Sequence, residues 1–284
     1  MKSNRLNIGI LFFGVFVILP FLSAFLYALL YSFGIIGVVN DGFTLKFWKS
    51  VLSSGDFFRS FFYSASIAAV STFLSVSGAL WITLKFRKEL EKGMFSFLIY
   101  LPLAVPGIVT GFFTFQLLSK GGFFSRIAFN LGIISEANQF PEMVNDTYAI
   151  GMVLSFITLA LPFFLLLFLN IYKNERVEEL AILAQSLGAN KAQITKKVFL
   201  PLLLRKSWIL IVLNFIATLG AYEVPIILGR QSPEMLSILI LREIRQYDLT
   251  KMSEGYVIAV IYTLMVTACV IFLFLSRKKA LHET

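Results

Sequence analysis

Six long apolar runs constrain the fold of this chain more than any other feature. Each run can cross about 30 Å of hydrocarbon, which takes about 20 helical residues. The runs are continuous and do not alternate in polarity, so they predict helices and not barrel strands. Because 58% of the 284 residues are hydrophobic and 14% are charged, no ordinary soluble domain is expected. The expected fold is a single all-α membrane domain over residues 1–284, with six transmembrane helices at 8–33, 60–84, 94–118, 148–171, 207–228 and 255–275.

The distribution of basic residues predicts the orientation. An even number of spans places both termini on one side, and that side carries 16 of the 25 Lys and Arg residues, including Lys2, Arg5 and Lys92. By the positive-inside rule, the termini and the charged segment 172–206 are cytoplasmic. The net charge of +9 is therefore a topology signal. No nucleic-acid partner is expected, since that would require a folded basic patch.

Residues for catalysis or metal binding are scarce. The single cysteine, Cys269, lies in the sixth run, and the single histidine, His282, lies in the polar tail. A metal site or a histidine-based catalytic apparatus needs more ligands and titratable groups than these. A phosphate-binding glycine-rich loop with its lysine is also missing from the sequence. We therefore expect a chain that is not an enzyme, has no catalytic or metal-binding residue and binds no cofactor itself.

The segment 178–201 predicts a helical elbow at the membrane surface. Its first arm follows the i, i+3, i+4, i+7 spacing of one apolar helix face. Gly188 suits the end of this arm, because a residue without Cβ enters the left-handed conformation cheaply. A second short helix is expected over 192–199, and Pro201 is expected to mark a break before the next membrane helix. The predicted apolar face, which we expect to be packed, consists of Leu180, Leu183, Ala184 and Leu187.

Ile182 lies about 200° around the helix from Leu180, on the polar face of the first arm. An apolar residue at this position serves no purpose in a surface helix without a partner, whereas it could contact another protein. Both interpretations of the elbow, a free amphipathic surface helix and a docking helix, fit its periodicity.

The spacing within this elbow resembles a known pattern. Gly188 is followed by nine residues and then by residues 198–201, which end in Leu200 and Pro201. This arrangement resembles the cytoplasmic coupling loop of ABC-importer permeases of the binding-protein-dependent class. Their pattern is E-A-A, three residues, G, nine residues, I, one residue, L-P. Ala184 occupies the position of the second alanine.

The first half of the motif departs from the family pattern. Ile182 and Leu183 stand where the family has Glu and Ala, and an acid stands instead at Glu179. The resemblance implies that the elbow seats in a groove of a separate ABC ATPase, which would bind ATP and Mg²⁺. It also implies a second permease subunit, in a hetero- or homodimer, an external substrate-binding protein and the lipid of the bacterial inner membrane.

The third apolar run contains a helix break. Pro102, Pro106 and Gly107 fall in mid-run, where they remove backbone hydrogen bonds and bend a helix. Such a break is tolerated in a membrane where it packs in protein or lines a cavity. It is interpreted as a flexible wall of the translocation path or as a packing kink, and similar breaks occur at this point in the family.

The fifth run ends near Glu223. At 1.5 Å per residue, this acid is expected about 24 Å along the helix from Ser207, near the outer interface. Glu223 is either a solvated helix end or part of a path or gate, because ionisable groups at membrane depth usually face a cavity. The flanking residues that form the expected break with it are Gly220, Tyr222 and Pro225.

The leading functional hypothesis is the membrane-spanning permease of an ABC importer for a small polar solute. A secondary transporter, the main alternative, should show inverted repeats and charged groups near the midplane, and a membrane-embedded enzyme should show a polar catalytic cluster. The stretch 220–229 resembles permeases of the polyamine, ferric iron, thiamine and phosphonate branch. Glu223 would favour a cationic solute such as a polyamine.

Overall fold

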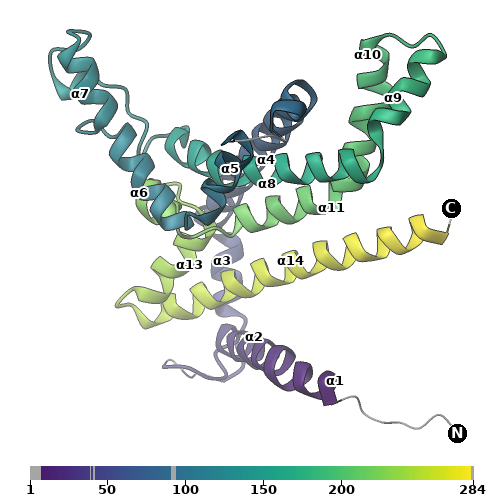
Figure 1. Ribbon diagram of the computed structural model, residues 1–284. Helices are drawn as coiled ribbons and strands as arrows, with labels where there is room; N and C mark the ends of the chain where they lie inside the picture. Colours follow the sequence, from purple (N-terminus) through teal and green to yellow (C-terminus); the bar gives the residue numbers. More distant parts are fainter. Residues whose placement is uncertain (1–7, 39, 41, 91–93, 283–284) are drawn as a thin grey trace, which may run out of the picture. The chain divides into compact units, whose positions relative to one another are not determined.

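A computed structural model describes residues 8–38, 40, 42–90 and 94–282 (Figure 1). Every regular element in these ranges is helical, which confirms the all-α prediction for the described chain. Lys2, Arg5 and Lys92, which contribute to the predicted orientation, lie outside these ranges. The elements are α1 (Ile8–Phe13), the π-turn η1 (Gly14–Ile18), α2 (Leu19–Ser32), α3 (Lys46–Ser53), α4 (Gly55–Leu90), α5 (Met94–Tyr100), the 3-10 turn η2 (Pro102–Ala104), α6 (Gly107–Leu118), α7 (Phe123–Asn130), the 3-10 turn η3 (Ala137–Gln139), α8 (Ile150–Asn174), α9 (Val177–Ser186), α10 (Lys191–Ile194), the π-turn η4 (Thr195–Phe199), α11 (Leu200–Leu219), α12 (Pro225–Leu228), α13 (Leu236–Arg245) and α14 (Leu249–His282).

Five helices among the described residues are long and apolar enough to cross a membrane, or up to six if a bent pair counts as one span. The bent pair corresponds to the third predicted run: its two halves, Phe97–Ala104 and Gly107–Asn130, meet at 100°. The predicted break at the prolines is therefore confirmed. The five unbroken candidates are Leu11–Ser32, Gly55–Arg87, Ile150–Asn174, Lys191–Leu219 and Leu249–Ser276.

The fifth predicted span differs from the prediction at both ends. Its helix begins at Lys191 and continues to Leu219, so the expected break at Pro201 is wrong. The π-turn η4 ends at Phe199, two residues before this proline, and its wider hydrogen bonds include the Leu200 N–H donating to the Thr195 carbonyl. A π-turn lets a helix continue past a proline that lacks its own N–H group. At the other end, Gly220 caps the helix, so residues 220–224 are not part of the span.

The described chain divides into two compact units, residues 60–236 and residues 1–59 with 237–284. The core of the first unit is a buried apolar cluster between α4, α5, α8 and α11. Phe164 and Phe168 stack with their ring centroids 6.1 Å apart, and both are fully buried. In lipid such helices associate through close packing and interhelical hydrogen bonds, because lipid tails are as apolar as the side chains. The cluster consists of Val76, Ala79, Leu80, Ile99, Ala160, Phe164, Leu165, Phe168, Leu169 and Leu203.

Interhelical hydrogen bonds between side chains also hold this unit together. Asn214 of α11 donates its amide to the Thr72 hydroxyl of α4 at 3.1 Å. Ser155 of α8 donates its hydroxyl to Thr114 of α6 at 2.8 Å. Hydrogen bonds of this kind stabilise helix pairs in membranes by about 0.6 kcal/mol on average. They fix α4 against α11 and α6 against α8.

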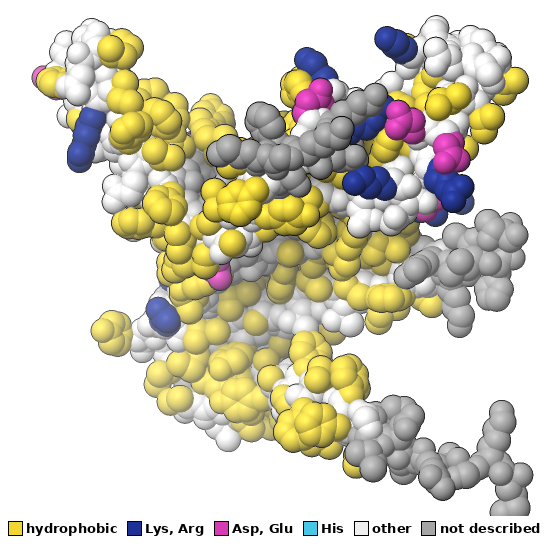
Figure 2. Space-filling model, viewed as in Figure 1, with side chains coloured by type: hydrophobic (Ala, Val, Ile, Leu, Met, Phe, Trp, Pro, Cys, Tyr) yellow, Lys and Arg dark blue, Asp and Glu magenta, His cyan; other side chains and the backbone are white. Residues whose placement is uncertain are grey.

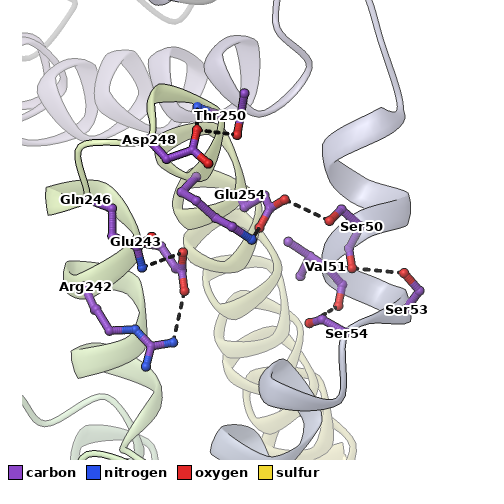
Figure 3. A network of polar contacts seen from close by, with 11 residues as sticks. Ser50, Val51, Ser53, Ser54, Arg242, Glu243, Gln246, Asp248, Thr250 and Glu254 are labelled. Atoms are coloured by element: carbon purple, nitrogen blue, oxygen red, sulfur yellow. Dashed lines mark hydrogen bonds and ion pairs between the residues drawn. The ribbon is translucent and has the colours of Figure 1, made fainter.

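In the second unit, α3, α13 and α14 meet in a polar network (Figure 3). Glu254 accepts from the Ser50 hydroxyl at 2.8 Å and from the Lys251 ammonium at 2.6 Å. Nearby, Glu243 is 8% exposed and pairs with Arg242 at 3.0 Å. At the start of α14, hydrogen bonds from the Thr250 hydroxyl and N–H hold the pKa of Asp248 below its usual value.

Candidate functional site

The first candidate site is the elbow formed by α9 and α10 (Figure 1). Gly188 ends the first arm with φ +86°, the left-handed conformation expected for it. Its N–H donates to the Gln185 carbonyl at 2.9 Å, and the Ala189 N–H donates to the Ala184 carbonyl at 3.0 Å. These two bonds form the Schellman pattern that ends many helices. A Cβ at Gly188 would meet no atom within 4 Å. The glycine is therefore required by backbone conformation and not by space.

The second arm begins with a capping box that the sequence analysis missed. The Asn190 side chain accepts from the Gln193 N–H, and the Gln193 side chain accepts from the Asn190 N–H, both at 2.9 Å. Two N–H groups at the helix start are thereby satisfied. The spacing of Asn190 and Gln193 is the sequence signal that could have revealed this cap. Only Ala189 separates it from Gly188, so the turn between the two arms is short and closed by hydrogen bonds.

The apolar face of α9 is arranged differently from the prediction. Leu180, Leu183 and Leu187 are 39%, 60% and 88% exposed, so the expected packed face is not packed within this chain. Val177 is instead fully buried and Ile194 is 7% exposed. Val177 lies about 60° around the helix from Leu180. The buried side of α9 is therefore rotated away from the side that carries the three leucines, which we call the leucine stripe. Ala184, between the two, is half-buried.

The elbow therefore presents apolar side chains to its surroundings. Leu187 and Ile182, which is 62% exposed, lie on different sides of α9. Figure 2 shows acidic and basic side chains gathered near the start of α9, whereas the tip of the elbow is mostly uncharged. Glu179 is among the exposed charges of α9. Exposed leucines that lie together on one helix end are typical of a surface that contacts another protein.

The end of the motif connects the elbow to the core. Leu200 is half-buried and packs against the apolar cluster of α4, α8 and α11. Pro201 follows it at an exposed position in the first turn of α11. Because η4 and α11 form one continuous helix, the second arm of the elbow is a direct extension of a candidate membrane span.

The second candidate site is the break in the third run. Pro102 starts the 3-10 turn η2, and Pro106 is the residue before α6, in an extended conformation. Gly107 is the first residue of α6. The first N–H groups of a helix have no partner within the helix, so this break exposes donors at the start of α6.

Glu223 supplies an acceptor for this helix start. Its carboxylate oxygen Oε2 accepts from the Ile108 N–H at 2.9 Å. A Cβ at Gly107 would collide with the same carboxylate. The structure thus brings together Glu223 and the break at Pro106 and Gly107, which are far apart in the chain. A carboxylate at a helix N-terminus also interacts favourably with the helix dipole.

The position of Glu223 corrects one part of the prediction. It does not lie on the fifth helix, because α11 ends at Leu219 and Glu223 belongs to the following turn. Tyr222 is 37% exposed, while Pro225 is buried at the start of α12. Gly220 caps α11, so the predicted break at this end of the span is present.

A further cap was not found from the sequence. Asp146 is 6% exposed, and its carboxylate accepts from the N–H groups of Tyr148 and Ile150 at 3.0 and 3.1 Å. It thereby caps α8. The neighbouring Asn145 N–H donates to the carbonyl of Leu228 at 3.0 Å, which ties the end of α12 to the start of α8. Within the described residues, no group of three or more His, Cys, Asp or Glu side chains is placed to hold a metal ion.

Comparisons with known proteins identify the family and the fold. Residues 75–278 match the family described as binding-protein-dependent transport system inner membrane component. No curated protein matches the chain significantly by sequence. A crystal structure of a bacterial ABC transporter involved in the import of the acidic polysaccharide alginate has a similar fold, with 17% identity and a TM-score of 0.69 over 96% of this chain and 92% of that chain.

A second solved structure is the bacterial alginate ABC transporter in complex with an alginate pentasaccharide-bound periplasmic protein. It is 18% identical, with a TM-score of 0.68 over 94% of this chain and 89% of that chain. At these identities the likeness shows the fold, whereas the family match covers most of the chain from α4 to α14. The chain belongs to the family of inner membrane components of binding-protein-dependent transport systems.

Proposed function

We propose that this permease component of an ABC importer forms part of a translocation path for a small polar solute and is driven by a separate ATPase. In this proposal the elbow of α9 and α10 docks on the ATPase. The observation that carries it is the exposed leucine stripe of Leu180, Leu183 and Leu187 on an arm closed by Gly188. An exposed apolar surface marks an interaction site, and a surface already held in one conformation loses less entropy on binding; the elbow has both properties.

The continuous helix from Lys191 to Leu219 supports the coupling role. A force applied to the second arm of the elbow passes along one helix into the membrane. Leu200, which packs on the core cluster, extends the same connection to α8 and α4. We propose that this helix transmits nucleotide-dependent movement of the ATPase to the path.

The second part of the proposal places the contact between Glu223 and α6 at the path. Charged groups at membrane depth usually face a cavity or a partner chain, and Glu223 is exposed in this chain. The path would be completed by a second permease subunit, and an external binding protein would deliver the solute. The solved neighbour that includes a periplasmic binding protein supports this assembly.

The solute is proposed only as small and polar. The carboxylate of Glu223 already accepts a hydrogen bond from α6, so its charge gives weaker support to a cationic solute than its sequence position did. The polyamine, ferric iron, thiamine and phosphonate branch stays a prediction.

Docking is tested by co-purifying the ATPase with variants of the chain. Leu187→Asp places a charge in the stripe and should reduce the ATPase retained per chain several-fold. Leu131→Asp is the matched control, because Leu131 is also exposed, at 70%, but lies after α7. Equal retention of the ATPase by the two variants would overturn the docking role of the elbow.

A further inference from the structure

One arginine connects three helices at the base of the elbow. Arg87 lies near the end of α4, and its guanidinium stacks over the ring of Tyr172 in α8, 4.8 Å from the ring centroid. Its Nη2 is 3.7 Å from Oε1 of Glu178 in α9. Its Nη1 donates to the Leu84 carbonyl at 3.4 Å, which holds the side chain against its own helix. A single side chain therefore bridges α4, α8 and α9.

The ring under this arginine is itself part of the elbow base. Tyr172 is 5% exposed, and Phe199 of η4 contacts it edge-on with the centroids 5.8 Å apart. The contacts from Arg87 through Tyr172 to Phe199 thus run from α4 to the second arm of the elbow. A separate ion pair, Lys206 with Glu175 at 2.8 Å, joins α11 to the corner between α8 and α9.

The two contacts that Arg87 makes with other helices differ in their exposure to water. The Glu178 side chain is 56% exposed, so its ion pair is screened by solvent and salt. The Tyr172 ring is buried, so the cation–π contact is screened less. A planar guanidinium can stack on a ring and point a donor at a carboxylate at the same time, whereas the ammonium of lysine is a point charge. The stack is therefore the main contact; a lysine could approach the ring, but its ammonium could not stack on the ring and keep a donor aimed at Glu178.

We propose that Arg87 is a positioning residue that fixes the angle of the elbow to α4, so that movement of the elbow reaches this membrane span. The inference rests on the proposed coupling function of the elbow. Through Arg87, α4 gains a direct connection to the elbow. The coupling motif lies between α8 and α11 and contains no such connection.

The isolated chain tests the positioning. Spin labels at Glu89→Cys and Ser186→Cys, in a Cys269→Ser background, report the distance between the end of α4 and the end of α9. Arg87→Lys should broaden this distance distribution at least two-fold. Lys85→Gln is the matched control, because Lys85 lies in the same turn but over Trp81 and Phe86 of its own helix. An unchanged width in Arg87→Lys would overturn the positioning role.

The assembled importer tests the consequence for coupling, measured as solute transported per ATP hydrolysed. Arg87→Lys should lower this ratio several-fold while the ATPase still co-purifies, and Lys85→Gln, the same matched control, should leave it within two-fold of wild type. A wild-type ratio of solute to ATP in Arg87→Lys, with normal ATPase retention, would refute the role of Arg87 and leave the proposed function standing. If the wild-type chain retains no ATPase, the proposed function itself fails.

Discussion

Gly107→Ala should break the contact between Glu223 and the start of α6. The added Cβ collides with the carboxylate, which must leave its position beside the Ile108 N–H. The lost interaction is a hydrogen bond to a charged acceptor together with a helix-dipole term. Because Glu223 is exposed, solvent weakens both contributions, and we expect a total loss of about 1 kcal/mol. This corresponds to a factor of about five in an equilibrium constant.

A double-mutant cycle isolates this contact. Gly107→Ala, Glu223→Ala and the double variant are compared by SDS titration of the chain in mixed micelles. Both single changes remove the same interaction, so the coupling energy should be about 1 kcal/mol. Gly121→Ala is the control, because a Cβ at Gly121 would meet no atom within 4 Å. Additive effects within about 0.3–0.5 kcal/mol would refute the contact.

The same variants test the link to transport. If the contact acts at the path, Gly107→Ala and Glu223→Ala should change uptake in the same direction. Glu223→Gln, which can still accept the hydrogen bond, should separate the charge from the bond. Unchanged uptake in all three variants, with the contact shown to be broken, would make it a structural cap only.

Three further predictions concern other parts of the chain. Gly188→Val should destabilise the elbow by about 1–2 kcal/mol, because a β-branched residue is forced to positive φ, and should uncouple ATP hydrolysis from uptake; wild-type coupling would contradict this. Ile182→Asp should reduce ATPase co-purification more than Leu183→Ala does, and wild-type retention in Ile182→Asp would leave Ile182 without a contact. Lys251→Met should lower the free energy of unfolding by about 1 kcal/mol, more than Ser50→Ala, because Glu254 loses its cation; equal effects in SDS titration would count against the network.

The sequence predicted the helical class, the break at Pro102 and Pro106 and the turn at Gly188, because each depends on local chemistry. Apolar runs need helices in lipid, prolines remove N–H donors, and glycine accepts positive φ. These features follow from neighbouring residues alone. The structure therefore agrees with them closely.

Other features depend on residues that are distant in the chain. Glu223 lies beside Ile108 because α11 ends before it, and periodicity does not show where an apolar helix ends. Val177 of α9 and Ile194 of α10 are the buried apolar residues of the elbow, whereas the leucines are exposed. The leucine spacing alone therefore predicted the wrong packed side. At Pro201 the π-turn before it preserved the helix, and proline rules do not indicate such a turn.

Site-specific photo-crosslinking tests the central claim most directly. A photoreactive amino acid at Leu187, the most exposed residue of the leucine stripe, is compared with the same group at Leu131 in the assembled importer. We predict a crosslink to the ATPase from position 187 and none from position 131. Absence of a crosslink from position 187, or equal crosslinking from both positions, would contradict docking of the elbow on the ATPase.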